Sequence, residues 1–203
     1  MLVVKSVEKK KSSMRMSAQK RKAIIVEAVF AQADSEGPDR LSTATIAKAS
    51  GLTHAGIFRH FPTKQDIWNE VANEIVIRAK FHWEKPLKAL SNPRKKIENL
   101  VSAQFDFLTQ TPAILTILFS YELQRANADL RHTFINMMVQ FRSYLIKEFL
   151  HAGFKKSNAE DYAFLLIALI QGVAIRWSVS QRNFNLKKEG KRLLKLQLDM
   201  IFN

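Results

Sequence analysis

The sequence contains no cysteine among its 203 residues. This absence excludes disulfide bonds, thiolate metal sites, iron–sulfur clusters and a cysteine nucleophile. A chain of this length buries roughly 70% of its unfolded surface, so it needs no covalent cross-link. Glycine and proline are also scarce, with six and five residues, and no proline follows Pro112. These shortages leave few helix breakers and favour long helices.

A long hydrophobic run is also missing. The longest strongly apolar stretch, Tyr162 to Ile175, has 14 residues and is closed by Asp161 and Arg176. A helix needs about 20 residues to cross a bilayer. The basic N-terminus is not followed by the apolar core or cleavage site of a secretory signal. We therefore expect a soluble, cytoplasmic protein with no membrane partner.

Acidic residues are few in comparison with basic ones. The chain has 32 Lys and Arg against 18 Asp and Glu, a net charge of +14 and a pI near 10.1. Residues 1–22 hold eight basic residues and one acid, and residues 40–64 hold no acid at all. Solubility needs far less charge than this. The balance indicates a polyanionic partner.

The pattern of apolar residues predicts an all-α fold. No stretch has the two-residue alternation of a half-buried strand. Residues 1–16 lack defensible periodicity, and we interpret them as a basic flexible tail. Helices are expected at 18–34, 43–50, 54–61, 64–86, 93–110, 112–123, 128–152, 158–181 and 187–202.

The most informative segment is residues 41–68, LSTATIAKASGLTHAGIFRHFPTKQDIW. Two short helices joined through Gly51 have the length and turn glycine of a helix-turn-helix. Ser42 and Thr53 are suited to cap the two helices. The second helix would present small residues at its N-terminal half, where a helix approaches base edges without clashing. The small core of this helix-turn-helix is expected to contain Ile46, Ala47, Ile57 and Phe61.

This segment resembles the DNA-binding domain of the TetR (tetracycline-repressor-like) family of bacterial transcriptional regulators. The resemblance rests on an ordered series: Gly37, Ser42, Ile46-Ala47, Gly51-Leu52-Thr53, Phe58 to Lys64, and Ile67. It covers roughly residues 20–80 at the level of motifs. It implies a three-helix helix-turn-helix domain, residues 17–64, followed by a larger helical effector-binding and dimerisation domain, residues 65–203.

The resemblance also implies the residues that contact DNA. Ser42 and Thr43 would hold backbone phosphates, Thr53 to Gly56 would face the major groove, and His60 and Lys64 would clamp phosphates. Phe58 stands where the family usually has a phosphate-bonding tyrosine, a loss of about one hydrogen bond, ~1–3 kcal/mol. The full expected set is Ser42, Thr43, Thr53, His54, Ala55, Gly56, Phe58, Arg59, His60 and Lys64.

Other interpretations of the same residues are weaker. His54 and His60 are six residues apart, a spacing that fits no helical metal pair, so no metal is expected. Gly51 and Gly56 resemble a phosphate loop only superficially, because Ile57 stands where that loop needs lysine. The basic tail most simply adds nonspecific phosphate affinity. No cofactor is expected.

The helix expected at 158–181 is apolar nearly all round, and such a helix must be covered on every side. A second subunit can supply this cover, and the family dimerises through two C-terminal helices of each chain. We expect a homodimer with recognition helices ~34–36 Å apart. The expected interface residues are Tyr162, Leu166, Leu169, Val173, Trp177, Leu194 and Leu198.

The middle of the chain is rich in aromatic residues, and the resemblance implies a small-molecule pocket there. A pocket needs a few oriented polar groups among apolar ones. Glu122 is suited either to a cationic ligand or to a local ion pair with Arg125. The expected lining is Gln104, Phe107, Phe119, Glu122, Met137, Phe141 and Gln171.

Together these observations favour a dimeric, sequence-specific repressor that a small-molecule effector releases from double-stranded DNA. A nonspecific nucleoid or architectural protein, driven by the basic tail, is the alternative. An enzyme is disfavoured, because the sequence lacks cysteine, a phosphate loop and a dinucleotide-binding glycine pattern.

Overall fold

The computed structural model describes the backbone of residues 2–88 and 92–203, and the side chains from Ala18 onward within these ranges. Every regular element in them is helical, which confirms the expected all-α fold. The order is α1 (Leu2–Ser35), η1 (Pro38–Arg40), α2 (Thr43–Ser50), α3 (His54–His60), α4 (Lys64–Lys88), α5 (Pro93–Gln110), α6 (Ala113–Phe119), α7 (Tyr121–Ala126), α8 (Ala128–His151), α9 (Lys156–Val179) and α10 (Leu186–Phe202).

Two differences from the expected helices are larger than two residues. α1 begins at Leu2 instead of residue 18, because no glycine or proline interrupts its N-terminal part. Met1 and the side chains up to Ser17 lie outside the described residues, so the flexibility of the tail stays a prediction. The single helix expected at 112–123 is two helices, because Ser120 is extended and its side chain accepts a hydrogen bond from the Leu123 amide, capping α7.

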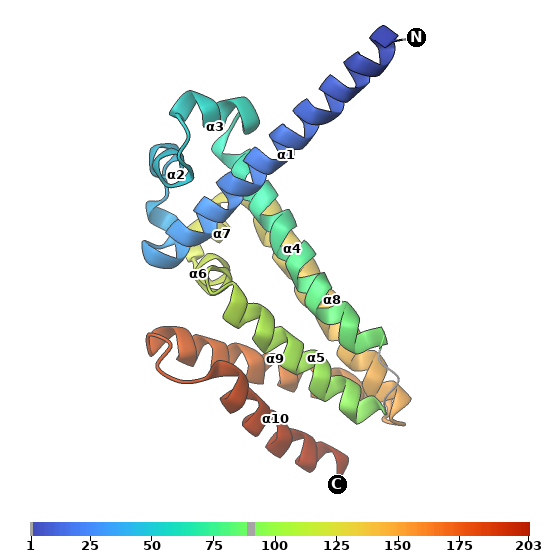
Figure 1. The fold of residues 1–203 in the computed structure, drawn as a ribbon. Helices are drawn as coiled ribbons and strands as arrows, with labels where there is room; N and C mark the ends of the chain where they lie inside the picture. The colour runs from blue at the N-terminus through green and yellow to red at the C-terminus, as the bar shows by residue number, and fades with distance from the viewer. Residues whose placement is uncertain (1, 89–91) are drawn as a thin grey trace.

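The helices form a small head and a larger body (Figure 1). α2 and α3 lie at one end of the molecule against the C-terminal half of α1, and the N-terminal part of α1 extends beyond the other helices. α4 leads from the head into the body, where it packs against α5 and α8. α9 and α10 complete the body at the end that carries the C-terminus.

Among the described residues, one helix is long and apolar enough to cross a membrane by length and composition. This helix is α9, with a mean hydropathy of 1.7 over its most apolar window, of which 33% is buried. It is longer than the 14-residue run because it continues past Asp161 and Arg176. α9 packs against α5, α6, α8 and α10.

Candidate DNA-binding surface and ligand pocket

The head is built around a small apolar core. Ile46 and Ala47 of α2, Ile57 of α3 and Phe61 at the end of α3 are buried, as the sequence predicts, and they pack against buried side chains of α1. Gly51 ends α2 in the left-handed conformation, with φ of 67°, which a side chain would strain. The turn therefore fixes the angle at which α3 leaves α2.

Side-chain caps fix the start of each short helix. The Ser42 hydroxyl accepts from the Thr45 amide at 3.1 Å, while the Thr45 hydroxyl accepts from the Ser42 amide at 3.0 Å. The Thr53 hydroxyl accepts from the Gly56 amide at 3.0 Å. A Cβ at Gly56 would stand 3.1 Å from this hydroxyl, so the position favours glycine. These caps satisfy amides that helix starts otherwise leave free.

The N-terminal half of α3 lies at the rim of the head. Thr53, His54 and Ala55 are exposed, and Gly56 is half-buried. The predicted base-reading residues are therefore brought together on one accessible edge, with no large side chain among them. Such an edge can approach the floor of a major groove.

His54 connects the recognition helix to α2. Its Nε2 lies 2.8 Å from the Thr43 hydroxyl, a hydrogen-bond distance. The ring of Phe58 meets the His54 ring edge-on, with centroids 4.8 Å apart. Phe58 is 39% exposed, so part of its surface stays open to a partner. In this structure Phe58 packs against His54 and helps to hold its ring toward Thr43.

The phosphate-binding candidates lie beside this edge. Lys64 donates from Nζ to the Leu41 carbonyl at 2.6 Å, and so ties the start of α4 to the turn before α2. Burial, then the charges of Arg21, Arg59 and Lys22, hold the pKa of His60 below its ordinary value of 6.5. His60 is therefore neutral at pH 7, within a group of cationic side chains from α1 and α3.

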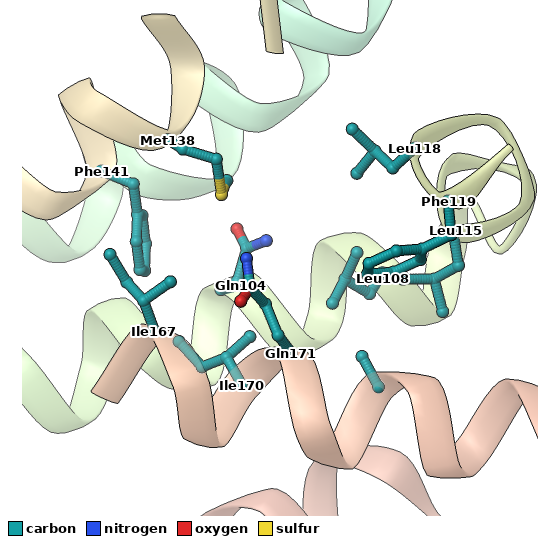
Figure 2. A pocket seen from close by; sticks show the side chains of 11 residues that line it. Gln104, Leu108, Leu115, Leu118, Phe119, Met138, Phe141, Ile167, Ile170 and Gln171 are labelled. Atoms are coloured by element: carbon teal, nitrogen blue, oxygen red, sulfur yellow. The ribbon is translucent and has the colours of Figure 1, made fainter. Parts of the chain in front are cut away.

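A cavity of about 50 Å³ lies in the body between α5, α6, α8 and α9 (Figure 2). Four of the predicted pocket residues line it: Gln104, Phe119, Phe141 and Gln171. The lining also includes seven residues outside the predicted set: Leu108, Leu115, Leu118, Met138, Ile167, Ile170 and Ala174. Their positions one helical turn from the predicted glutamines are the signal that would have identified several of them.

The other three predicted pocket residues lie elsewhere. Phe107 is buried beside His82, with ring centroids 5.7 Å apart. Met137 is buried, and its neighbour Met138 lines the cavity instead. Glu122 is exposed on α7 and pairs with Arg125 at 3.4 Å. Larger surface hollows of about 480 Å³ exist, such as the one between α4 and α5, but their linings include charged side chains.

The expected interface residues mostly face inward. Leu166, Val173, Trp177, Leu194 and Leu198 are buried in the core of their own subunit. Tyr162 and Leu169 are half-buried. The apolar side chains that α9 and α10 leave exposed are different ones: Phe164, Leu165, Ile175 and Val179 on α9, and Leu196 and Met200 on α10.

α6 joins the cavity to the head. It supplies Leu115, Leu118 and Phe119 to the cavity lining. On the same helix, the Thr116 hydroxyl lies 3.0 Å from the carbonyl oxygen of Ala33, near the end of α1, and 2.8 Å from that of Ala113, and it can donate to either. Immediately after α6, the Ser120 hydroxyl donates to Asp39 of η1 at 2.6 Å. A movement of α6 would therefore be transmitted to the base of the head.

The turn between α9 and α10 makes a further contact with the head. Arg182 forms a two-pronged ion pair with Asp34 of α1, with Nη1 2.9 Å from Oδ2. The guanidinium also lies over the Trp177 ring, 5.4 Å from its centroid. Gln181 and Arg182 both adopt positive φ, 53° and 62°, which non-glycine residues rarely do.

Within the part of the chain whose side chains are described, no three His, Asp or Glu side chains gather as metal ligands would.

The fold and the exposed edge of α3 define a helix-turn-helix DNA-binding protein with a helical second domain. Residues 25–71 match the family described as bacterial regulatory proteins, tetR family. These residues therefore form a DNA-binding domain of the TetR type, the domain of bacterial transcriptional regulators.

Solved structures share the fold over most of the chain. A TetR transcription regulator from Haloarcula marismortui is 16% identical with a TM-score of 0.76, over 90% of this chain and 98% of that one. A regulator from Saccharomonospora viridis, in complex with choline, is 19% identical with a TM-score of 0.78, over 89% and 96%. Similar curated sequences include the nucleoid occlusion factor SlmA of Marinomonas sp., 24% identical over 75% of this chain and 80% of the relative.

Proposed function

We propose that the protein is a dimeric, sequence-specific repressor that a small molecule releases from its operator. The observation that carries this proposal is the exposed, capped edge of α3, residues 53–56, in a segment without acidic residues. The proposed place of action is the cytoplasm. The proposed domains are a head of residues 17–64 and a body of residues 65–203, with residues 1–16 adding nonspecific affinity for phosphates.

In this proposal α3 enters the major groove. Thr53 and His54 contact base edges, while Ala55 and Gly56 allow close approach. Arg59, His60 and Lys64 lie toward the flanking phosphates, and the N-terminus of α2 at Ser42 and Thr43 receives another phosphate. Phe58 supports His54 by packing and offers an apolar surface to a thymine methyl.

The dimer is proposed to form through the exposed apolar side chains of α9 and α10. Phe164 and Leu165 are adjacent, and Ile175 and Val179 follow eleven and fifteen residues after Phe164. At 3.6 residues per turn these spacings keep the four side chains on one side of α9. A second copy of the same face would cover them in a four-helix arrangement with two-fold symmetry. The two copies of α3 would then reach successive major grooves on one side of the duplex.

The proposed effector site is the cavity lined by α5, α6, α8 and α9. Structural neighbours of the same fold were solved with choline and with stearoyl-CoA, the latter a FadR regulator from Bacillus subtilis. A ligand that moves α6 would act on the head through Thr116 and Ser120. Such movement would change the separation of the two recognition helices and release DNA.

Selection of bound sequences from a random duplex library, followed by footprinting, tests this function. We expect a two-fold symmetric site, and His54→Ala should change the preferred bases. Arg59→Ala should weaken binding to all sequences about equally and reduce the salt dependence by about one phosphate contact. Arg59 is a better phosphate variant than Lys64, because Lys64 also holds the Leu41 carbonyl. Uniform coverage of DNA without a preferred sequence would contradict the proposal.

A second candidate function is suggested by the relatives named as nucleoid occlusion factors and by the net charge of +14. In this case the protein would bind the nucleoid broadly and without an effector. Deleting residues 1–16 separates the two candidates. A sequence-specific repressor should keep its preferred site with weaker affinity, whereas a protein driven by its basic tail should lose DNA binding.

A further inference from the structure

Trp83 fixes the orientation of Gln104 in the body of the protein. An indole N–H can only donate a hydrogen bond. The Trp83 Nε1 lies 2.7 Å from the Gln104 Oε1, and both side chains are buried, with Gln104 only 5% exposed. The carboxamide oxygen of Gln104 therefore faces the indole, and its NH₂ group must face the other way.

That NH₂ group belongs to the lining of the cavity. Figure 2 shows the Gln104 carboxamide projecting into the space below Met138, in the cavity that Gln171 also lines. Among the described residues, no hydrogen bond satisfies the Gln104 Nε2. The Trp83 ring is itself held by Phe141, with centroids 4.9 Å apart. The cavity thus contains a hydrogen-bond donor of fixed direction.

The remainder of the lining is apolar except for Gln171. It contains no ionisable side chain. A charged ligand would lose its hydration without meeting an opposite charge, at a high cost in free energy. A purely apolar ligand would leave the Gln104 NH₂ group without a partner.

We propose that this cavity binds a small neutral molecule, mainly apolar, that carries a hydrogen-bond acceptor such as a ketone, ester or ether oxygen. The acceptor receives a hydrogen bond from the Gln104 Nε2. Gln104 is the specificity-determining residue, and Trp83 is a positioning residue that acts through it. This inference rests on the proposed effector site.

The size of the cavity limits the ligand. Its volume of about 50 Å³ corresponds to about four water molecules. Phe119 and Gln171, which also line the cavity, are exposed, so one side of it reaches the surface. A ligand therefore places a compact acceptor-bearing end against Gln104 and extends any longer apolar chain toward Phe119.

Four probes of matched size test the proposal on the full chain: pentan-2-one, 2-methylpent-1-ene, butanoate and pentylammonium. Dissociation constants are measured by ligand-observed NMR. We expect the ketone to bind about three- to tenfold more tightly than the alkene, the effect of one hydrogen bond. Both ions should bind more than about tenfold more weakly than the ketone.

Variants assign this preference to one side chain. Gln104→Leu should reduce the ratio of ketone to alkene affinity to about one. Because this change leaves the buried Trp83 N–H without an acceptor, the double variant Trp83→Phe/Gln104→Leu, which removes both partners, provides the same test with less loss of stability. Trp83→Phe alone should reduce the ratio partly, since the carboxamide is then free to rotate. Gln171→Leu is the matched control and should preserve the ratio.

The outcomes separate this inference from the proposed function. If none of the four probes binds, the effector site itself is refuted, and the proposed function with it. If ketone and alkene bind equally, or if the double variant keeps the preference for the ketone, the effector site stands and the role of Gln104 is overturned. Preferred binding of either ion would equally overturn the neutral class of ligand.

Discussion

At the scale of single residues, we expect His60 to couple DNA binding to pH. Its pKa lies below 6.5 in the free protein because of burial and the charges of Arg21, Arg59 and Lys22. Phosphates placed beside it would raise that pKa, because they favour the charged imidazole. The complex then binds more protons than the free protein, so affinity for DNA must increase as the pH falls.

We therefore expect DNA affinity to rise about three- to tenfold between pH 7.5 and pH 5.5, where a change of one pKa unit corresponds to tenfold. Fluorescence anisotropy on a fixed duplex at constant ionic strength measures it. His60→Gln should flatten the profile. His151→Gln, at the end of α8 farthest from the head (Figure 1), should not. An unchanged slope in His60→Gln would place the titrating group elsewhere.

At the scale of elements, two residues of the turn between α9 and α10 have strained backbone conformations, and one of them contacts the head. Gln181 and Arg182 occupy the left-handed region, which costs a non-glycine residue about 1–2 kcal/mol. At Arg182 the strain is offset by side-chain contacts, since its guanidinium binds Asp34 and covers Trp177. Gln181 is exposed, and no described side-chain contact compensates its strain.

Gln181→Gly should therefore raise the free energy of unfolding by about 0.5–1 kcal/mol, the relief of strain minus the greater backbone entropy of glycine. Urea unfolding followed by circular dichroism measures it. The matched control is Lys195→Gly, at an exposed position inside α10, which should lose about 1 kcal/mol. If both variants lost the same amount of unfolding free energy, the positive φ at Gln181 would carry no strain.

The elements themselves were largely predictable from the sequence. Ser42, Gly51 and Thr53 mark α2 and the start of α3 correctly, because caps and turn glycines act locally. The break between α6 and α7 at Ser120 is not predictable in this way, because serine also occurs inside helices. The N-terminal extension of α1 was missed because a basic segment without an apolar face shows no helical periodicity.

Which side of a helix faces which neighbour was less predictable. Met137 and Met138 are adjacent and chemically identical, so only the phase of α8 decides which one lines the cavity. α9 is apolar on nearly every side, so its sequence does not distinguish the face toward its own core from the exposed one. For this reason the sequence predicts Leu166 and Val173 at the interface, whereas the structure buries them within the subunit.

At the scale of the whole molecule, the body has a surface that one subunit leaves uncovered. Exposed apolar residues occur singly on most proteins. Here, however, Phe164, Leu165, Ile175 and Val179 are distributed over the C-terminal two thirds of α9. A face of this length favours a second subunit, and the proposed repressor needs one to place two copies of α3 on one duplex.

Ile175→Lys should therefore convert the protein into monomers, because each dimer would bury two lysines against an apolar face. Sedimentation equilibrium measures the change, which should exceed tenfold in the dimer dissociation constant. The fold should survive, since Ile175 is 41% exposed in the subunit. Affinity for a two-fold symmetric site should fall, because one head then binds alone.

The control is Ile77→Lys, which changes the same residue type at an exposed position on α4, away from α9. It should leave the protein dimeric. A wild-type protein that sediments as a single subunit at micromolar concentration would contradict the dimer, and with it the spacing of two recognition helices. If instead both lysine variants remained dimeric, the subunits would meet through another surface, and the separation of the heads would no longer follow from α9.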